Sequence, residues 1–212
     1  MSKIEELAAA VTKGKAKLVP NLVNECLAEG TDPVEILNKG MIDAMSIIGE
    51  KFKNNEVFVP EVLVAARALN AGLAILEPKL IEVGNEPVGK VVIGTIKGDL
   101  HDIGKNLVAM MLKGVGFEVI DLGVDVEPET FIAKAEEAGA DVICISALLT
   151  TTMPGMQSVI DALQEKGLRD KYIVMVGVAP VNQSFADQIG ADYYTPDAAT
   201  AAEVAKKAVS EK

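Results

Sequence analysis

From residue 91 onward the chain alternates short apolar runs with helical segments, and this alternation limits the fold more than any other feature. Such a pattern predicts an α/β fold with a parallel sheet that helices cover on both faces. Five strands favour the flavodoxin-like (Rossmann-like) order 2-1-3-4-5. The strands are expected at Val91–Ile96, Glu118–Leu122, Val142–Ser146, Tyr172–Val176 and Asp192–Tyr194, with helices near residues 104–114, 128–138, 153–166, 183–189 and 197–210.

The N-terminal part has only helical signals and predicts an all-α four-helix bundle. Ser2 and Glu5 form a capping box, and Asp32 with Glu35 is expected to form a second one. Residues 83–89 carry turn formers without periodicity, so we expect a linker there and domains at 1–88 and 89–212. The helices are expected from Ser2 to Gly14, Ala16 to Glu29, Asp32 to about Phe52, and Pro60 to about Leu76, before Pro78.

Charge and composition exclude several classes of function. The formal net charge is −11, so no basic patch is expected that could bind nucleic acid or an anionic membrane. No apolar run is judged long enough to span a membrane, and the first residues lack the features of a signal peptide. Two distant cysteines, Cys26 and Cys144, suggest neither a disulfide framework nor a zinc site. A cytoplasmic protein is expected.

The predicted topology places ligand chemistry at the carboxyl ends of the strands, near the switch point between the first and third strands. The turn after the first strand, residues 98–106, contains the only histidine of the chain, His101. A run of hydroxyl residues follows the third strand, and Gly177 follows the fourth. These groups are expected on one rim of the sheet.

The residues of this rim allow two interpretations. Asp99 stands two positions before His101, and a metal-bound imidazole commonly donates its second N–H to a carboxylate. Alternatively, the two side chains belong to a solvated turn and hydrogen-bond locally. The chain has no GxGxxG or GxxxxGK[ST] motif, which argues against a dinucleotide or nucleotide site. One histidine cannot build a zinc cluster.

The ordered set Asp99-x-His101-x-x-Gly104, Ser146-x-Leu148 and Gly177 resembles the cobalamin-binding signature DxHxxG…SxL…GG of the methionine-synthase type. The nearest resemblance is to the corrinoid proteins of methylamine, methanol and methoxyl methyltransferase systems. It covers nearly the whole chain, including a helical cap domain with the segments Gly49-Glu50-Lys51-Phe52 and Val59-Pro60-Glu61. One departure is Val178, which stands where the family has the second glycine.

The resemblance implies a cobalamin or related corrinoid cofactor, with His101 as the lower axial ligand of cobalt. It implies that Asp99 and Ser146 form a hydrogen-bond relay, that the nucleotide tail enters a channel beside the sheet, and that the helical bundle caps the upper face of the corrin. The implied cofactor-binding residues are Asp99, Leu100, His101, Asp102, Ile103, Gly104, Ser146, Leu148, Thr150, Gly177, Val178, Tyr194 and Pro196.

The function implied is that of a methyl carrier, whose cobalt cycles between Co(I) and methyl-Co(III). The resemblance implies a corrinoid subunit of a methyltransferase system that is not expected to be catalytic alone. Its partners would be a substrate-specific methyltransferase, a second methyltransferase using tetrahydrofolate or coenzyme M, and a reductive activase, with neither nucleic acid nor membrane. The alternatives are a B12-dependent sensor, which lacks its output module here, and the small subunit of a carbon-skeleton mutase, which would not need residues 2–82.

Overall fold

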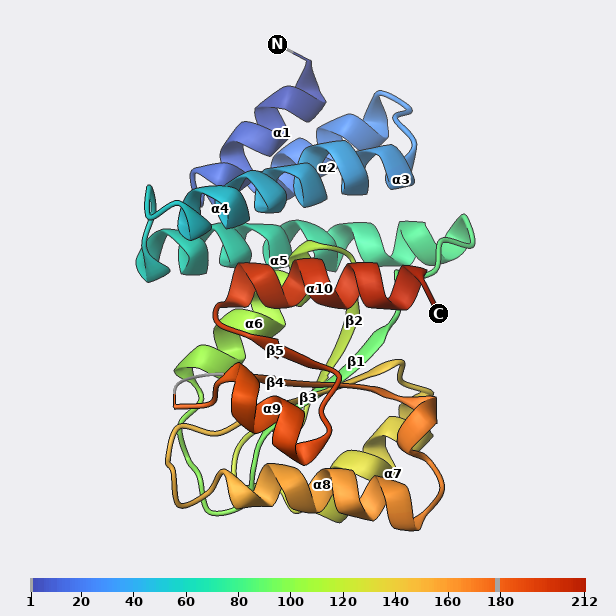
Figure 1. Cartoon of the computed structure of the whole chain (residues 1–212). Helices are drawn as coiled ribbons and strands as arrows, with labels where there is room; N and C mark the ends of the chain where they lie inside the picture. Colours follow the sequence, from blue (N-terminus) through green and yellow to red (C-terminus); the bar gives the residue numbers. More distant parts are fainter. Residues whose placement is uncertain (1, 178–179) are drawn as a thin grey trace. The chain divides into compact units, whose positions relative to one another are not determined.

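The protein consists of two compact units in a computed structural model that describes residues 2–177 and 180–212. The first unit comprises Met1–Pro87 with Gly114–Gly116, and the second comprises Val88–Lys113 with Phe117–Lys212. The elements of both units are labelled in Figure 1. Each unit is built around its own apolar interior, and the expected boundary at residues 88 and 89 stays a prediction.

The first unit is helical, as the sequence predicts. The capping box at its start is present: Glu5 N donates to Ser2 Oγ at 3.3 Å, and Ser2 N donates to Glu5 Oε2 at 2.8 Å. Pro20 lies in the first turn of its helix, where its missing N–H costs no intrahelical bond. The elements are α1 (Lys3–Thr12), α2 (Val19–Ala28), α3 (Pro33–Glu35), the π-helix η1 (Ile36–Ile42), α4 (Asp43–Lys53) and α5 (Val59–Glu82).

The third predicted helix is more irregular than expected. A π-helical segment, η1, separates α3 from α4 and packs against α1. Gly40 lies in it at a close approach, since a Cβ there would come within 2.6 Å of Leu7 Cδ2. Asp32 caps the helix by accepting from Val34 N at 2.8 Å. The predicted second capping box is wrong, because the Glu35 carboxylate pairs with Lys39 one turn later.

The fourth helix continues past the end that the sequence predicts. Helix α5 passes through Pro78 and ends at Glu82, with Leu76 and Leu80 both buried. Proline removes one backbone donor but does not force a stop where packing holds the following turn. With this extension, α5 becomes long and apolar enough, by length and composition, to cross a membrane. A core helix of a bundle passes the same test, and α5 packs against α2 and α4.

The second unit contains the predicted parallel sheet, and its order β2-β1-β3-β4-β5 is confirmed. The strands are β1 (Lys90–Thr95), β2 (Glu118–Asp121), β3 (Val142–Ser146), β4 (Ile173–Gly177) and β5 (Tyr193–Thr195). Four residues form one row across the carboxyl edge, because Ser146 pairs with both Thr95 and Gly177, and Gly177 pairs with Thr195. Two sequence-predicted site residues are therefore direct neighbours.

Helices cover both faces of this sheet (Figure 1). They are α6 (Ile103–Gly114), α7 (Pro128–Ala138), α8 (Pro154–Glu165), the short 3₁₀ helix η2 (Arg169–Lys171), α9 (Gln183–Ile189) and α10 (Ala198–Ser210). Helices α7, α8 and α9 share one continuous apolar cluster with the sheet. Helix α8 comes close to the end of β1 at Gly155, where a Cβ would lie 2.6 Å from Cγ1 of Ile96, the residue after the strand. Residues of α6 and α10 lie over the other face.

Candidate corrinoid site

A tight turn between β1 and α6 carries His101, and the sequence determines its shape locally. Gly98 adopts φ +81°, a left-handed conformation that favours glycine. Its amide donates to Asp125 Oδ1 at 2.8 Å. The buried Thr95 hydroxyl, at the end of β1, donates to the His101 carbonyl oxygen at 2.9 Å. The histidine backbone is thus held from the strand that precedes it.

Asp99 holds the imidazole, and the loop after β3 holds Asp99. The Asp99 side chain is fully buried. Its Oδ1 lies 2.7 Å from His101 Nδ1 and accepts from His101 N at 3.1 Å. Its Oδ2 accepts from Leu148 N at 2.8 Å, Leu149 N at 3.1 Å and Thr152 Oγ1 at 2.9 Å. Both oxygens are therefore saturated by donors from two strand-end loops.

These donors control the charge of Asp99. Burial alone would raise the pKa of its carboxyl, but hydrogen bonds from His101, Leu148 and Thr152 outweigh burial and hold the pKa well below the usual range. The carboxylate is consequently ionised at neutral pH and accepts a hydrogen bond from the imidazole N–H at Nδ1. In this tautomer the lone pair is on Nε2, the nitrogen that faces away from Asp99.

The imidazole is exposed in an apolar setting. The His101 side chain is 52% exposed. Leu100 and Ile103, which flank it in sequence, are 71% and 75% exposed, and Leu148 and Leu149 in the facing loop are also exposed. Large apolar side chains gathered around a free nitrogen ligand form a surface suited to a flat, largely apolar ligand that carries a metal.

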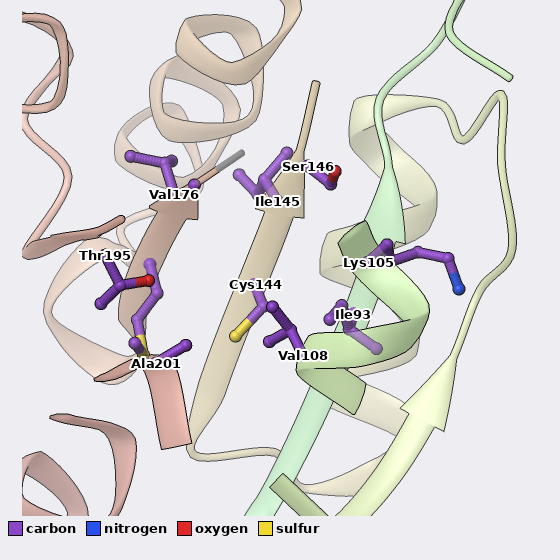
Figure 2. A pocket seen from close by; sticks show the side chains of 11 residues that line it. Ile93, Lys105, Val108, Cys144, Ile145, Ser146, Val176, Thr195 and Ala201 are labelled. Atoms are coloured by element: carbon purple, nitrogen blue, oxygen red, sulfur yellow. The ribbon is translucent and has the colours of Figure 1, made fainter. Parts of the chain in front are cut away.

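A narrow cavity lies beside this turn, between the sheet and helices α6 and α10 (Figure 2). Its volume is about 30 Å³, which is comparable to one water molecule. Entry of a nucleotide therefore requires the helices to separate from the sheet. Apart from Ser146, Thr195 and Lys105, the lining is apolar or backbone: Ile93, Val108, Cys144, Ile145, Met175, Val176, Gly177 and Ala201.

The structure brings only part of the predicted set to this cavity. Ser146 and Gly177 line it, whereas Gly104, Leu148, Tyr194 and Pro196 do not. Gly104 lies in the first turn of α6, Leu148 and Thr150 are exposed in the loop after β3, and Pro196 is exposed after β5. Asp102 is exposed at the His101 turn. Val178 lies outside the described residues.

Tyr194 is on the wrong face of the sheet to line the cavity. Its side chain packs against the apolar cluster of α7, α8 and α9, while its neighbour Thr195 is buried and faces the cavity. Successive side chains of a strand point to opposite faces. Tyr194 pairs with Val176 of the apolar cluster, so the next residue, Thr195, which pairs with Gly177, faces the cavity.

The hydrogen-bond relay that was predicted to run from Asp99 to Ser146 runs from Asp99 to Thr152 instead. Among the hydrogen bonds of the described residues, none joins Asp99 to the Ser146 side chain, and the hydroxyl that reaches Asp99 belongs to Thr152. Thr152 does not cap α8, since no side-chain cap is present at that helix start. The hydroxyl run after β3 was the signal for such a residue, although it could not select among its members.

Gly177 has a steric reason to be glycine. A Cβ there would lie 3.0 Å from the Thr195 carbonyl oxygen in the neighbouring strand. Contacts this close force the backbone to shift. Glycine therefore keeps β4 and β5 together at the mouth of the cavity.

The residues present fit a corrinoid. The described residues contain no cluster of three or more His, Cys, Asp or Glu side chains that could hold a bare metal ion. A single oriented imidazole nitrogen is nevertheless sufficient where the other ligands belong to the cofactor. The exposed leucine and isoleucine side chains suit the flat macrocycle, and the cavity beside Ser146 and Gly177 marks where its tail would enter once the helices separate from the sheet. Fold and site together define a corrinoid-binding α/β protein with a helical N-terminal unit.

Comparison with known proteins agrees with this class. B12 binding domain families match residues 89–205 and residues 3–77. A corrinoid protein from Desulfitobacterium hafniense is 44% identical over 98% of this chain and 97% of its own length. The trimethylamine corrinoid protein of Methanosarcina barkeri is 43% identical, covering 99% of this chain and 100% of that protein.

A solved structure extends the likeness to three dimensions. The methanol:cobalamin methyltransferase complex MtaBC of Methanosarcina barkeri contains a chain with a TM-score of 0.89 and 29% identity, covering 99% of this chain and 80% of that one. The chain belongs to the family of corrinoid proteins with B12 binding domains.

Proposed function

We propose that this protein carries a methyl group on the cobalt of a bound corrinoid, between a methyltransferase that loads it and a second methyltransferase that unloads it. The observation that carries the proposal is the His101–Asp99 pair. A buried, ionised carboxylate fixes Nδ1 and leaves Nε2 as a metal ligand, beside a cavity that would widen to admit the nucleotide tail.

The cobalt of the bound corrinoid supplies the methyl-accepting and methyl-donating chemistry. The protein's own residues bind and orient. Asp99 holds the imidazole at Nδ1, so that Nε2 would be the nitrogen presented to the cobalt. Thr152 and the backbone amides of Leu148 and Leu149 keep Asp99 in place. Ser146 and Thr195 offer hydroxyls to the tail at the sheet edge.

The other residues that the resemblance implies as cofactor contacts are assigned by their proximity to these groups. Leu100, Ile103 and Leu148 would contact the macrocycle, with Asp102, Gly104 and Thr150 at its edge. Pro196 follows β5 and would lie near the tail, whereas Val178 is assigned to the tail by the sequence resemblance alone. In this proposal the helical unit, residues 1–88, shields the reactive face of the corrin.

The partners proposed are a substrate-specific methyltransferase, a methyltransferase that uses tetrahydrofolate or coenzyme M, and a reductive activase. Support comes from relatives named for trimethylamine and from a likeness to a chain of a methanol:cobalamin methyltransferase complex. A cytoplasmic location is proposed as well, supported by two free, buried cysteines, Cys26 and Cys144.

The first test is an absorption spectrum of the protein reconstituted with hydroxocobalamin, beside the His101→Ala variant. We expect the wild-type spectrum to show histidine ligation with the cofactor's own base displaced, and the variant to lose that signature. Identical spectra would remove His101 as the ligand, and failure of the wild-type protein to bind any corrinoid would overturn the proposal.

A second assay separates a carrier from the alternatives. The methylated, reconstituted protein is mixed with a tetrahydrofolate- or coenzyme M-dependent methyltransferase of a corrinoid system, and methylated product is measured. Methyl transfer is expected. A protein that binds cobalamin and transfers no methyl group to either acceptor would favour the sensor or mutase-subunit alternative.

A further inference from the structure

Lys105 is a buried cation that has no role in holding the imidazole of His101 through Asp99. Its side chain is 2% exposed, and the only other buried charged residue of the described chain is Asp99. These two opposite charges lie on either side of His101 in sequence. Burying an ammonium group is costly unless it is fully paired, so its position calls for a specific role.

All the hydrogen-bonding capacity of this ammonium is used. Lys105 Nζ donates to both carboxylate oxygens of Asp121 at 2.5 Å and to Asn106 Oδ1 at 2.7 Å. Asp121 is the last residue of β2. Figure 2 shows the Lys105 side chain running away from Cys144 and Thr195, so its stem lies at the cavity while its nitrogen points elsewhere. The lysine thus ties the first turn of α6 to the end of a strand.

The same network returns to His101 by two routes. On one side, Asn106 Nδ2 donates to Asp102 Oδ2 at 3.0 Å, and Asp102 directly follows the histidine. On the other side, Gly123 N donates to Asp121 Oδ1 at 2.9 Å, and Gly123 O accepts from Thr95 N. Thr95 in turn donates its hydroxyl to the His101 carbonyl oxygen.

We propose that Lys105, paired with Asp121, is a positioning residue that holds the His101 turn in its ligating conformation when the cavity beside it widens to admit a corrinoid tail. The inference rests on the proposed function. Helix α6 begins directly after the histidine turn, and the cavity volume of about 30 Å³ obliges α6 or α10 to move on binding. The Lys105–Asp121 pair anchors the start of α6 so that the movement does not displace the imidazole.

The test compares Lys105→Met with a control, Lys97→Met. Methionine keeps the apolar stem and removes the donor to Asn106 Oδ1 and to Asp121, whose side chain is 40% exposed and reaches water. Lys97 lies in the same loop as His101 and pairs with Glu127, but its side chain is 53% exposed. The two variants remove the same charge and differ in burial.

Each variant is titrated with hydroxocobalamin and with cobinamide, which lacks the nucleotide tail. The affinity and the absorption spectrum of each complex are recorded at a temperature where circular dichroism shows that the variant is folded. We expect Lys105→Met to weaken both affinities about 10-fold, as loss of a supporting contact to a metal ligand does, and to lower the histidine-ligated fraction. Lys97→Met is expected to match the wild-type protein. Lys105→Arg should recover part of the loss.

Three results would overturn the inference. Lys105→Met could match Lys97→Met in both affinities and spectra, or it could bind either corrinoid more tightly than wild-type. A loss confined to hydroxocobalamin would assign Lys105 to the wall of the tail cavity instead of the His101 turn. If the wild-type protein itself bound no corrinoid, the proposed function would fail first, so the two failures are distinguishable.

Discussion

The two faces of the sheet differ in what they bury. The face under α7, α8 and α9 is a continuous apolar cluster. The opposite face, with residues of α6 and α10 over it, has a cavity with two hydroxyls in its wall. The buried polar or charged residues of the described chain all lie at the carboxyl edge of the sheet. They are Thr95, Asp99, Lys105, Ser146 and Thr195. We infer that the face under α7, α8 and α9 mainly stabilises the fold. The face under α6 and α10 buries polar groups, which lowers stability but provides groups for binding the corrinoid.

The largest effect is expected on the filled face. Phe131 is fully buried in α7, against β1 at Gly94. Phe131→Ala should lower the free energy of unfolding by about 3–5 kcal/mol, because it leaves a void in a packed core. Urea unfolding measures the loss. Corrinoid affinity is measured on the fraction of the protein that stays folded. A loss of affinity of about 10-fold or more would show that this face contributes to binding as well as to stability.

Asp99 provides the next largest effect. Asp99→Asn places an amide donor against backbone donors and should cost about 2–3 kcal/mol of stability. Since the pKa of the Asp99 carboxyl is lowered on folding, its stabilisation is present above the unfolded value near pH 4 and is lost as pH falls through the folded pKa. The stability difference between wild-type and variant should therefore shrink below about pH 4 in urea titrations. A difference independent of pH would contradict this assignment.

A filled cavity should affect binding more than stability. Val108 lines the cavity from α6 and is only partly buried. Val108→Phe should cost about 1 kcal/mol of stability by overpacking. It should weaken hydroxocobalamin binding at least about 10-fold and leave tail-less cobinamide within about 3-fold of wild-type, in the same titration. Equal losses for both corrinoids would mean that the cavity is not where the tail binds.

The smallest effect is expected at Tyr172, on the filled face. Its side chain is buried, and its hydroxyl lacks a hydrogen-bond partner among the described residues. Tyr172→Phe removes a desolvated group and no bond, so the free energy of unfolding should change by less than about 0.5 kcal/mol or rise. A loss above 1 kcal/mol, on the order of a whole hydrogen bond, would show that the hydroxyl has a partner.

Much of the second unit could be predicted because its pattern is periodic and its connections are short. The strand order follows from strands alternating with helices, and the His101 turn from its place after the first strand. The predictions that were wrong depend on single residues. The alternation of side chains along β5 put Thr195 and not Tyr194 at the cavity, and tertiary packing carried α5 past Pro78. Thr152 was hidden among three adjacent threonines.

The central claim is that His101 Nε2 binds cobalt, and the composition of the chain permits a direct test. His101 is the only histidine, so labelling the protein with [¹⁵N]histidine labels one imidazole alone. The electron paramagnetic resonance spectrum of the bound Co(II) corrinoid is then compared with that of unlabelled protein. If His101 is the ligand, each line that ¹⁴N splits into a triplet in the unlabelled protein should become a doublet in the labelled protein. Triplets that persist in the labelled protein would show that another nitrogen, such as the cofactor's own base, is the ligand.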